Sequence, residues 1–214
     1  MVGIPLTRPD YHAGFRGQVV GAIEAAISEV PGAEVDVILS PFTKEQELEG
    51  IIEATNFLAE KCVAEGYDFL WIVEADVEVP KVALYRLLRV RADVALGIYP
   101  THQEGALRMM AGHFEVDPEH VKPIVRSDVD ALTLRNNVFR GMVWAGVGCA
   151  LISRRVLESL RFVYDYEEYG QKAGVHDQLF LFEAQLRGFR VLLHGGVLCG
   201  HLPEWPLHKA GGRQ

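Results

Sequence analysis

Three acidic residues follow a strongly apolar run in the first half of the chain. The run FLWIV ends at Val73, and Glu74, Asp76 and Glu78 come at alternate positions directly after it. Alternate residues of an extended strand point to one face, so three carboxylates would lie side by side if the strand continues. Crowded carboxylates repel one another unless a cation or hydrogen-bond donors neutralise them. Such oxygen ligands suit Mg²⁺ or Mn²⁺, which also bind substrate phosphates. The alternative is a solvated loop after a buried strand.

Histidine and aspartate residues in the last quarter of the chain suit the same chemistry. His176 and Asp177 stand where a helix is expected to begin. Asp177 therefore fits either a catalytic carboxylate or an ordinary helix N-cap. His201 follows a strand and a glycine, where an imidazole either completes a Mn²⁺-type site or packs against its neighbours.

Two other segments are suited to holding a ligand. The segment WAGVGCALI contains Gly146 and Gly148, which let the backbone pass close either to a ligand or to another strand. Trp144 offers a flat face for stacking on a sugar or base, or else a core side chain. Near the N-terminus, PLTRPD either binds a nucleotide through Thr7 and Arg8 or simply turns the chain.

Strand-like and helix-like segments alternate along the chain and would position these residues. This alternation predicts an α/β fold, with a mostly parallel central sheet covered by helices on both faces. The apolar periodicity weakens between about 101 and 142, where only short antiparallel strands at 121–126 and 129–134 are expected. We expect strands at 2–6, 35–40, 69–73, 93–100 and 191–195, a strand running into a helix over 144–160, and helices at 14–30, 44–65, 81–91 and 176–189.

Composition and missing motifs exclude several classes of protein. The 214 residues suit one domain, and 21 Lys and Arg against 29 Asp and Glu give a net charge of −8, which disfavours nucleic-acid binding. No apolar stretch is long enough to cross a membrane and no signal-like segment starts the chain, so we expect a cytoplasmic protein. Three cysteines without a CxxC pair are expected to be buried. The absence of GxGxxG, GxxxxGK[ST] and GxSxG argues against dehydrogenases, P-loop kinases and α/β-hydrolases.

Four motifs, in order, resemble those of the small family 2-type glycosyltransferases of the GT-A fold. They are VGIPLTRP, ATNFLAEKCVAEGYDFLWIVEADVEVP, WAGVGCALISRRVLESL and HDQLFLFEAQLRGFRVLLHGGVLCGHL, and they span nearly all of the chain except about 101–141. The resemblance implies a single domain, 1–214. Its half at 1–100 would bind a nucleotide sugar, and its half at 101–214 would carry the acceptor and catalytic groups.

The resemblance implies roles for residues on the donor side. Asp76 matches the last acid of the family's DxD motif, which binds Mn²⁺ or Mg²⁺, and His201 matches a histidine that often completes the metal site. Glu74 stands where the family usually has aspartate facing the nucleotide ribose, and Ala75 lies between the two acids. Asn56 matches an asparagine near the nucleotide, although Thr55 precedes it where arginine is common.

The first strand and the catalytic motif complete the implied site. Pro5, Thr7 and Arg8 fall in the nucleotide-binding segment. Asp177 matches the general base that deprotonates the acceptor hydroxyl, and His176 beside it replaces the usual glutamate. Together with Trp144, Gly146 and Gly148, His176 would border the acceptor sugar.

The resemblance thus implies a metal-dependent, inverting glycosyltransferase that uses a UDP- or GDP-linked sugar. Two alternatives stay open: a sugar-phosphate nucleotidyltransferase, although the loop after the first strand has few basic residues, and a nucleotide-sugar-binding module that has lost catalysis. The sequence leaves the sugar, the acceptor and the oligomeric state undetermined.

Overall fold

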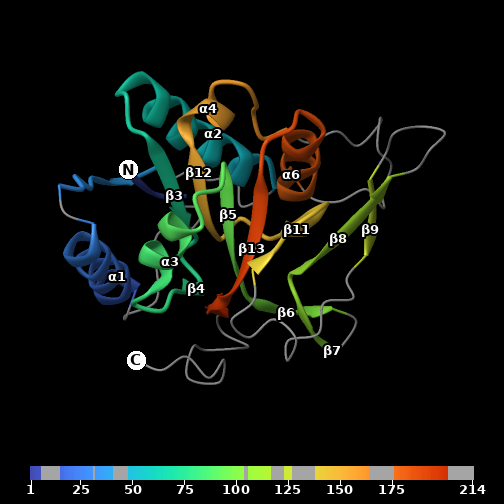
Figure 1. Ribbon diagram of the computed structural model, residues 1–214, viewed down its shortest axis with the longest axis horizontal. Helices are drawn as coiled ribbons and strands as arrows, with labels where there is room; N and C mark the ends of the chain where they lie inside the picture. Colours follow the sequence, from blue (N-terminus) through green and yellow to red (C-terminus); the bar gives the residue numbers. More distant parts are fainter. Residues whose placement is uncertain are drawn as a thin grey trace.

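The computed structural model describes residues 1–5, 15–30, 32–40, 48–103, 106–116, 123–126, 138–163 and 176–201. Thr7, Arg8 and the strand expected at 129–134 lie outside this part of the chain. Within it, helices alternate with strands as the apolar pattern predicts (Figure 1). The helices are α1 (Phe15–Glu29), α2 (Leu48–Ala64), α3 (Ala83–Arg89), α4 (Arg154–Leu157) and α6 (His176–Leu186).

Seven of the described strands form the central sheet, in the order β10-β13-β5-β12-β3-β1-β2. β1 pairs in parallel with β2 and β3, and β13 pairs in parallel with β5, whereas β12 and β10 are antiparallel to their neighbours. The sheet is therefore mixed, with most strands running one way, and the expected α/β class is confirmed. The strands are β1 (Val2–Ile4), β2 (Val37–Leu39), β3 (Phe69–Val73), β5 (Val94–Ile98), β10 (Val138–Phe139), β12 (Cys149–Ser153) and β13 (Val191–Leu198).

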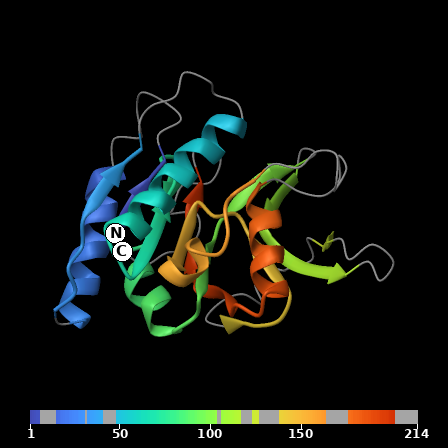
Figure 2. The ribbon, with the colours of Figure 1, turned by 90° about the horizontal axis from the view of Figure 1, so that it is seen from above.

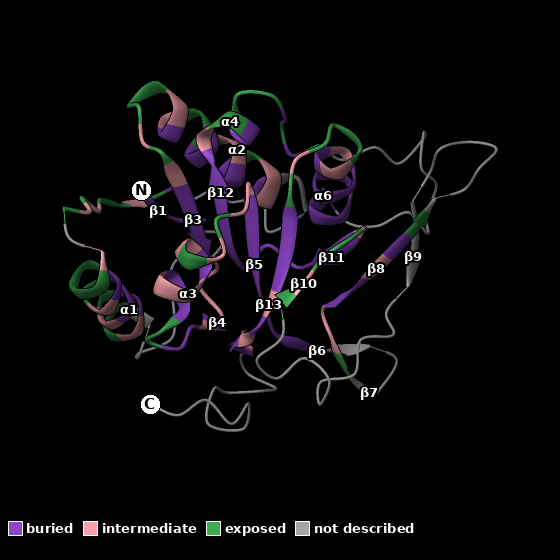
Figure 3. Cartoon of the chain, in the orientation of Figure 1, coloured by how far each residue is buried: buried purple, intermediate pink, exposed green. Residues whose placement is uncertain are grey.

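Helices cover both faces of this sheet, because its central strands bury both sets of alternating side chains (Figure 3). On one face, Leu70 and Ile72 of β3 pack in a cluster with residues of α2, α4 and α6. On the other face, Trp71 and Val73 pack with residues of α1 and α3. Figure 2 shows α1 at one end of the molecule and α6 toward the other.

Three smaller sheets lie beside the central one. The largest has the order β11-β8-β9, and in Figure 1 β8 and β9 extend away from α1. β14 pairs with β4, and β6 pairs with β7, both antiparallel. The strands are β4 (Val77–Glu78), β6 (Pro100–Gln103), β7 (Ala106–Met109), β8 (Ala111–Val116), β9 (Pro123–Arg126), β11 (Val143–Ala145) and β14 (Gly200–His201).

The segment expected as one strand and helix over 144–160 is divided differently. β11 belongs to the smaller sheet and β12 to the central sheet, with residues 146–148 between them, and α4 ends at Leu157. Hydrophobicity cannot reveal this division, because both strands are fully buried.

The described part of the chain confirms that the cysteines are buried. Cys62, Cys149 and Cys199 are all buried, free thiols. None of the described helices combines the length and the hydrophobicity needed to cross a membrane.

Candidate functional site

The candidate site lies where the chain leaves one edge of the central sheet. β3, β5 and β13 run in the same direction, so their carboxyl ends meet at this edge. Glu74 follows β3, Tyr99 follows β5, and His201 comes shortly after β13, whereas Gly148 immediately precedes the antiparallel strand β12. Ligands of open α/β sheets bind outside such carboxyl ends.

The chain turns sharply after β3, and the three acids therefore do not share one strand face as the spacing predicted. The Val77 amide donates to the Glu74 carbonyl at 3.0 Å, which closes a turn through Ala75 and Asp76. Glu78 lies beyond the turn in β4, where it accepts a hydrogen bond from Gln18 Nε2 of α1 at 3.2 Å. The shared face was expected only if the strand continued, and the turn after Val73 means that this condition is not met.

The turn brings Asp76 close to His201. β4 and β14 pair antiparallel, with His201 opposite Val77, and Asp76 Oδ2 lies 3.8 Å from His201 Nε2. Both side chains are partly exposed. Among the described residues no three His, Cys, Asp or Glu side chains form a group that could hold a metal ion. That Asp76 and His201 bind a divalent cation therefore stays a prediction.

Glu74 is held inward, beside Tyr99. Its amide donates to the Gly148 carbonyl at 3.0 Å. A Cβ on Gly148 would lie 2.5 Å from Glu74 Oε2 and 2.9 Å from the Tyr99 hydroxyl, so glycine leaves the room that both side chains occupy. Burial, followed by the nearby charges of Asp76 and Asp177, raises the pKa of Glu74 to about 8.

Tyr99 belongs to this group, although the sequence did not single it out. Its side chain is 4% exposed and its hydroxyl accepts a hydrogen bond from the Gly148 amide at 3.2 Å. Burial, with Glu74 and Asp177 next, raises its pKa well above the ordinary value. The sequence placed Tyr99 inside the strand expected at 93–100, where a buried tyrosine is usually a core residue, so no local signal marked it.

Asp177 is the second residue of α6 and accepts a hydrogen bond from the Gly146–Gly148 segment. It is 5% exposed and accepts hydrogen bonds from backbone amides, including those of Gln178 at 2.8 Å and Val147. Burial raises the pKa of Asp177, while His176, when it is protonated, and the amide donors oppose that rise. The result is a buried carboxylate whose charge is partly compensated by backbone donors.

α6 is held in place by a side-chain clamp on β11. Gln185 accepts a hydrogen bond from the Val143 amide at 2.7 Å, and its Nε2 donates to the Val143 carbonyl at 2.9 Å. These two hydrogen bonds attach α6 to the strand that precedes residues 146–148. The helix that carries Asp177 and the segment that carries the Val147 amide are therefore fixed relative to each other.

His176 is buried next to Asp177. It is 5% exposed, and neither ring nitrogen has a hydrogen-bond partner within the part of the chain that is described. Its ring centroid lies 6.1 Å from that of Phe162, and burial lowers its pKa, so the neutral form is favoured. A buried imidazole without partners has capacity for a hydrogen bond to a ligand.

Three of the expected site residues, Trp144, Asn56 and Pro5, are buried or hydrogen-bonded within the fold itself. Trp144 is 1% exposed in the core cluster, which is the second of the two positions that the sequence left open. Asn56 is bonded to the Phe162 backbone, accepting from its amide at 3.0 Å and donating to its carbonyl at 2.7 Å. Pro5 is buried at the end of β1. Their expected contacts with donor or acceptor stay predictions.

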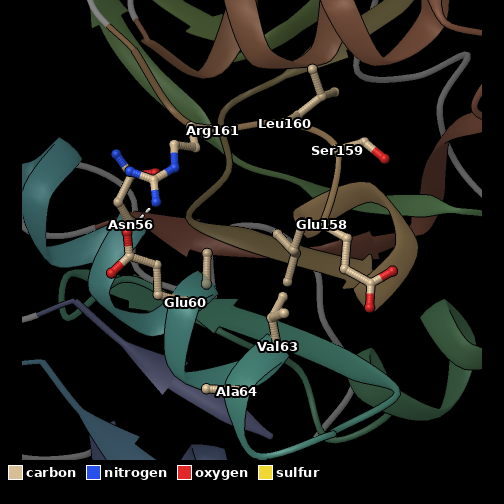
Figure 4. Close-up of a pocket in the computed structure, with 10 residues that line it drawn as sticks. Asn56, Glu60, Val63, Ala64, Glu158, Ser159, Leu160 and Arg161 are labelled. Atoms are coloured by element: carbon tan, nitrogen blue, oxygen red, sulfur yellow. Dashed lines mark ion pairs between the residues drawn. The ribbon is translucent and has the colours of Figure 1, made fainter.

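Asn56 also borders a pocket of about 430 Å³ between α2 and the segment after α4 (Figure 4). Its wall includes Ala59, Val63 and Leu160, and an ion pair joins Arg161 to Glu60 at 2.7 Å. None of the acids or histidines of the candidate site lines it, so the pocket is separate from that site.

One comparison with known proteins agrees with the fold. The sequence matches no family model and no curated protein. Among solved structures, it is similar to A197 from STIV, with 10% identity, a TM-score of 0.53, and coverage of 95% of this chain and 85% of that one. A nucleoside-diphosphate-sugar pyrophosphorylase from Vibrio cholerae RC9 has 12% identity and a TM-score of 0.46, with coverage of 92% and 91%. At this identity, the first likeness shows a shared α/β fold and nothing about activity.

Proposed function

We propose that this protein is a metal-dependent, inverting glycosyltransferase that moves a sugar from a nucleotide sugar to a hydroxyl acceptor. The observation that carries the proposal is the convergence of Asp76, His201 and Asp177 from three distant parts of the chain at the carboxyl edge of one sheet. The order of sequence motifs that resembles family 2-type glycosyltransferases supports the same function.

Asp76 and His201 would hold Mn²⁺ or Mg²⁺. Their 3.8 Å separation and partial exposure suit two ligands that leave room for phosphate oxygens. A cation bound there supplies positive charge against the leaving nucleoside diphosphate. Glu74, partly exposed at the turn, would face the nucleotide side.

Asp177 would act as the general base. As the acceptor oxygen attacks the anomeric carbon, the bond from that carbon to the diphosphate breaks and the acceptor proton passes to the Asp177 carboxylate. Attack from the face opposite the leaving group inverts the anomeric centre. Burial that raises the pKa of Asp177 makes it a stronger base than an exposed aspartate, while the Val147 and Gln178 amides stabilise its charged form.

Calorimetric titration of UDP and GDP, each with and without Mn²⁺, tests the donor site. We expect one nucleotide to bind only with metal, and this binding to be lost in Asp76→Ala. Asp68→Ala is the matched control, because the Asp68 side chain is 86% exposed and contacts only Arg154 among the ion pairs described. If neither nucleotide binds under any metal condition, the donor-site assignment is wrong.

Asp177→Asn separates an enzyme from a module that only binds nucleotide sugars. For the enzyme, turnover should fall about 10²- to 10⁴-fold while metal-dependent nucleotide binding is kept. A binding module has no turnover to lose. Turnover that is unchanged in Asp177→Asn would contradict the general-base assignment.

A further inference from the structure

The Tyr99 hydroxyl occupies space that two glycines leave open. A Cβ on Gly146 would lie 2.1 Å from this oxygen, and one on Gly148 would lie 2.9 Å from it. Real Cβ atoms do not approach other atoms so closely, so both glycines are needed for the hydroxyl to sit against the backbone. Gly148 then donates its amide hydrogen to that oxygen at 3.2 Å.

The main chain of Tyr99 is connected, through Met110, to Gly146 at the other end of the Gly146–Gly148 segment. The Met110 amide donates to the Tyr99 carbonyl at 2.8 Å, and the Gly146 amide donates to the Met110 carbonyl at 3.1 Å. Residues 146–148 are therefore tied to Tyr99 at Gly148 through the hydroxyl and at Gly146 through Met110.

Val147 lies between these two attachments, and its amide donates to Asp177. Asp177 itself is fixed on α6, which Gln185 clamps to β11. A change in the position of residues 146–148 would therefore alter the contact between the Val147 amide and the Asp177 carboxylate. The Tyr99 ring also packs against the His201 ring, with centroids 5.2 Å apart and an interplanar angle of 42°.

We propose that Tyr99 is the positioning residue of this site, because its hydroxyl fixes the Gly146–Gly148 segment and thereby the amide that orients Asp177. The inference rests on the proposed function for its effect on turnover, but the contact network itself does not depend on it. Tyr99 acts through Gly148 and Val147.

The test compares Tyr99→Phe with Tyr85→Phe. The control removes a hydroxyl that accepts a hydrogen bond from Arg89 on α3. Binding of UDP and GDP with Mn²⁺ is measured by calorimetry, and hydrolysis of UDP-glucose and GDP-mannose gives kcat. We expect Tyr99→Phe to lower kcat about 10-fold or more, with the nucleotide dissociation constant within about twofold of wild type. An unchanged kcat, or an equal loss of binding and turnover, would overturn the inference.

Gly146→Ala also displaces the Tyr99 hydroxyl, because the added Cβ would occupy the position of that oxygen. Because both substitutions disturb one contact, their effects on kcat should not add in the double variant. Additive losses would show that the two residues act independently, and would contradict the inference. Melting curves of all four variants establish that each is folded.

Amide NMR gives a readout that does not need turnover. Tyr99→Phe should change the shifts and hydrogen-exchange rates of the Val147 and Gly148 amides, whereas Tyr85→Phe should not. If wild type neither binds nucleotide nor hydrolyses sugar nucleotides, the proposed function fails. The Val147 and Gly148 amides then test the positioning role of Tyr99. Changed shifts or exchange rates in Tyr99→Phe support that role, and unchanged values overturn it.

Discussion

Asp76 and His201 come from opposite halves of the chain, and the pairing of β4 with β14 brings their side chains within 3.8 Å. Neither residue alone suggests a metal site, because a single carboxylate after a strand and a single histidine near a strand end are common surface features. Together they would offer one oxygen and one nitrogen ligand to the cation of the proposed function, at the edge of the sheet where Glu74 and Asp177 also lie.

His201→Ala should weaken metal-dependent nucleotide binding at least about tenfold, because it removes one of two protein ligands. Calorimetry with Mn²⁺ and the nucleotide that binds wild type measures the change. His113→Ala is the control, since His113 lies in β8, where it faces Glu115 rather than an acid of the site. Equal affinities of wild type and His201→Ala would remove His201 from the metal site.

Glu74→Gln should stabilise the metal-free protein at alkaline pH. The folded-state pKa of Glu74 is about 8, against 4.5 for an ordinary glutamate. The folded protein thus retains a proton that the unfolded chain releases, and the free energy of unfolding falls as pH rises from about 4.5 to 8. Below this window the two proteins should be equally stable. At pH 8 the variant should be more stable by about 1–3 kcal/mol, after allowing for solvent screening of a partly exposed group.

Urea unfolding at pH 4 and pH 8 measures this difference. Glu53→Gln provides the matched control, because Glu53 is exposed on α2 and should show the same small effect at both pH values. A Glu74→Gln variant whose stability follows wild type at both pH values would mean that Glu74 is ionised in the folded protein at neutral pH.

The sequence predicted most of the central sheet, because its inner strands are apolar on both faces. It missed β10, which lies in the segment where the apolar pattern weakens. β3 agrees residue for residue with the expected strand at 69–73. In α1, apolar Val19, Ile23 and Ala26 recur at helical spacing and are buried as expected, whereas Val20 and Ile27, expected on the same side, are exposed. The spacing of apolar residues along the sequence is therefore enough to locate most of these elements.

The site was only partly predictable, because it depends on contacts between distant segments. Residue types and the family resemblance drew attention to Asp76, Asp177 and His201, which the structure brings to one edge of the sheet. Tyr99 could not be found this way, because nothing local separates it from a core tyrosine. Its importance appears only when Gly146 and Gly148, distant in sequence, are seen to make room for its hydroxyl.

Gly148→Ala should destabilise the protein by about 1–3 kcal/mol, since the added methyl carbon would lie within 3 Å of Glu74 Oε2, the Tyr99 hydroxyl and Val77 Cγ2. Gly17→Ala is the matched control. A Cβ at Gly17 meets nothing within 4 Å on α1, so this substitution should be neutral or stabilise by up to about 1 kcal/mol. Chemical unfolding of both variants measures the contrast, and equal stabilities would mean that the backbone near Gly148 relaxes freely.

Asn56→Ala tests whether this asparagine holds the fold or the nucleotide. The side chain bonds both the amide and the carbonyl of Phe162, so its loss should lower the free energy of unfolding by about 1–3 kcal/mol in urea titrations. Glu60→Ala, on the same helix, removes the exposed ion pair with Arg161, the one Glu60 ion pair within the described part of the chain, and should cost less than about 1 kcal/mol. Because the amide of Asn56 is already engaged, we expect the metal-dependent nucleotide affinity to stay within about twofold of wild type. A tenfold loss of affinity in a folded, stable variant would instead support the donor contact that the family resemblance implies.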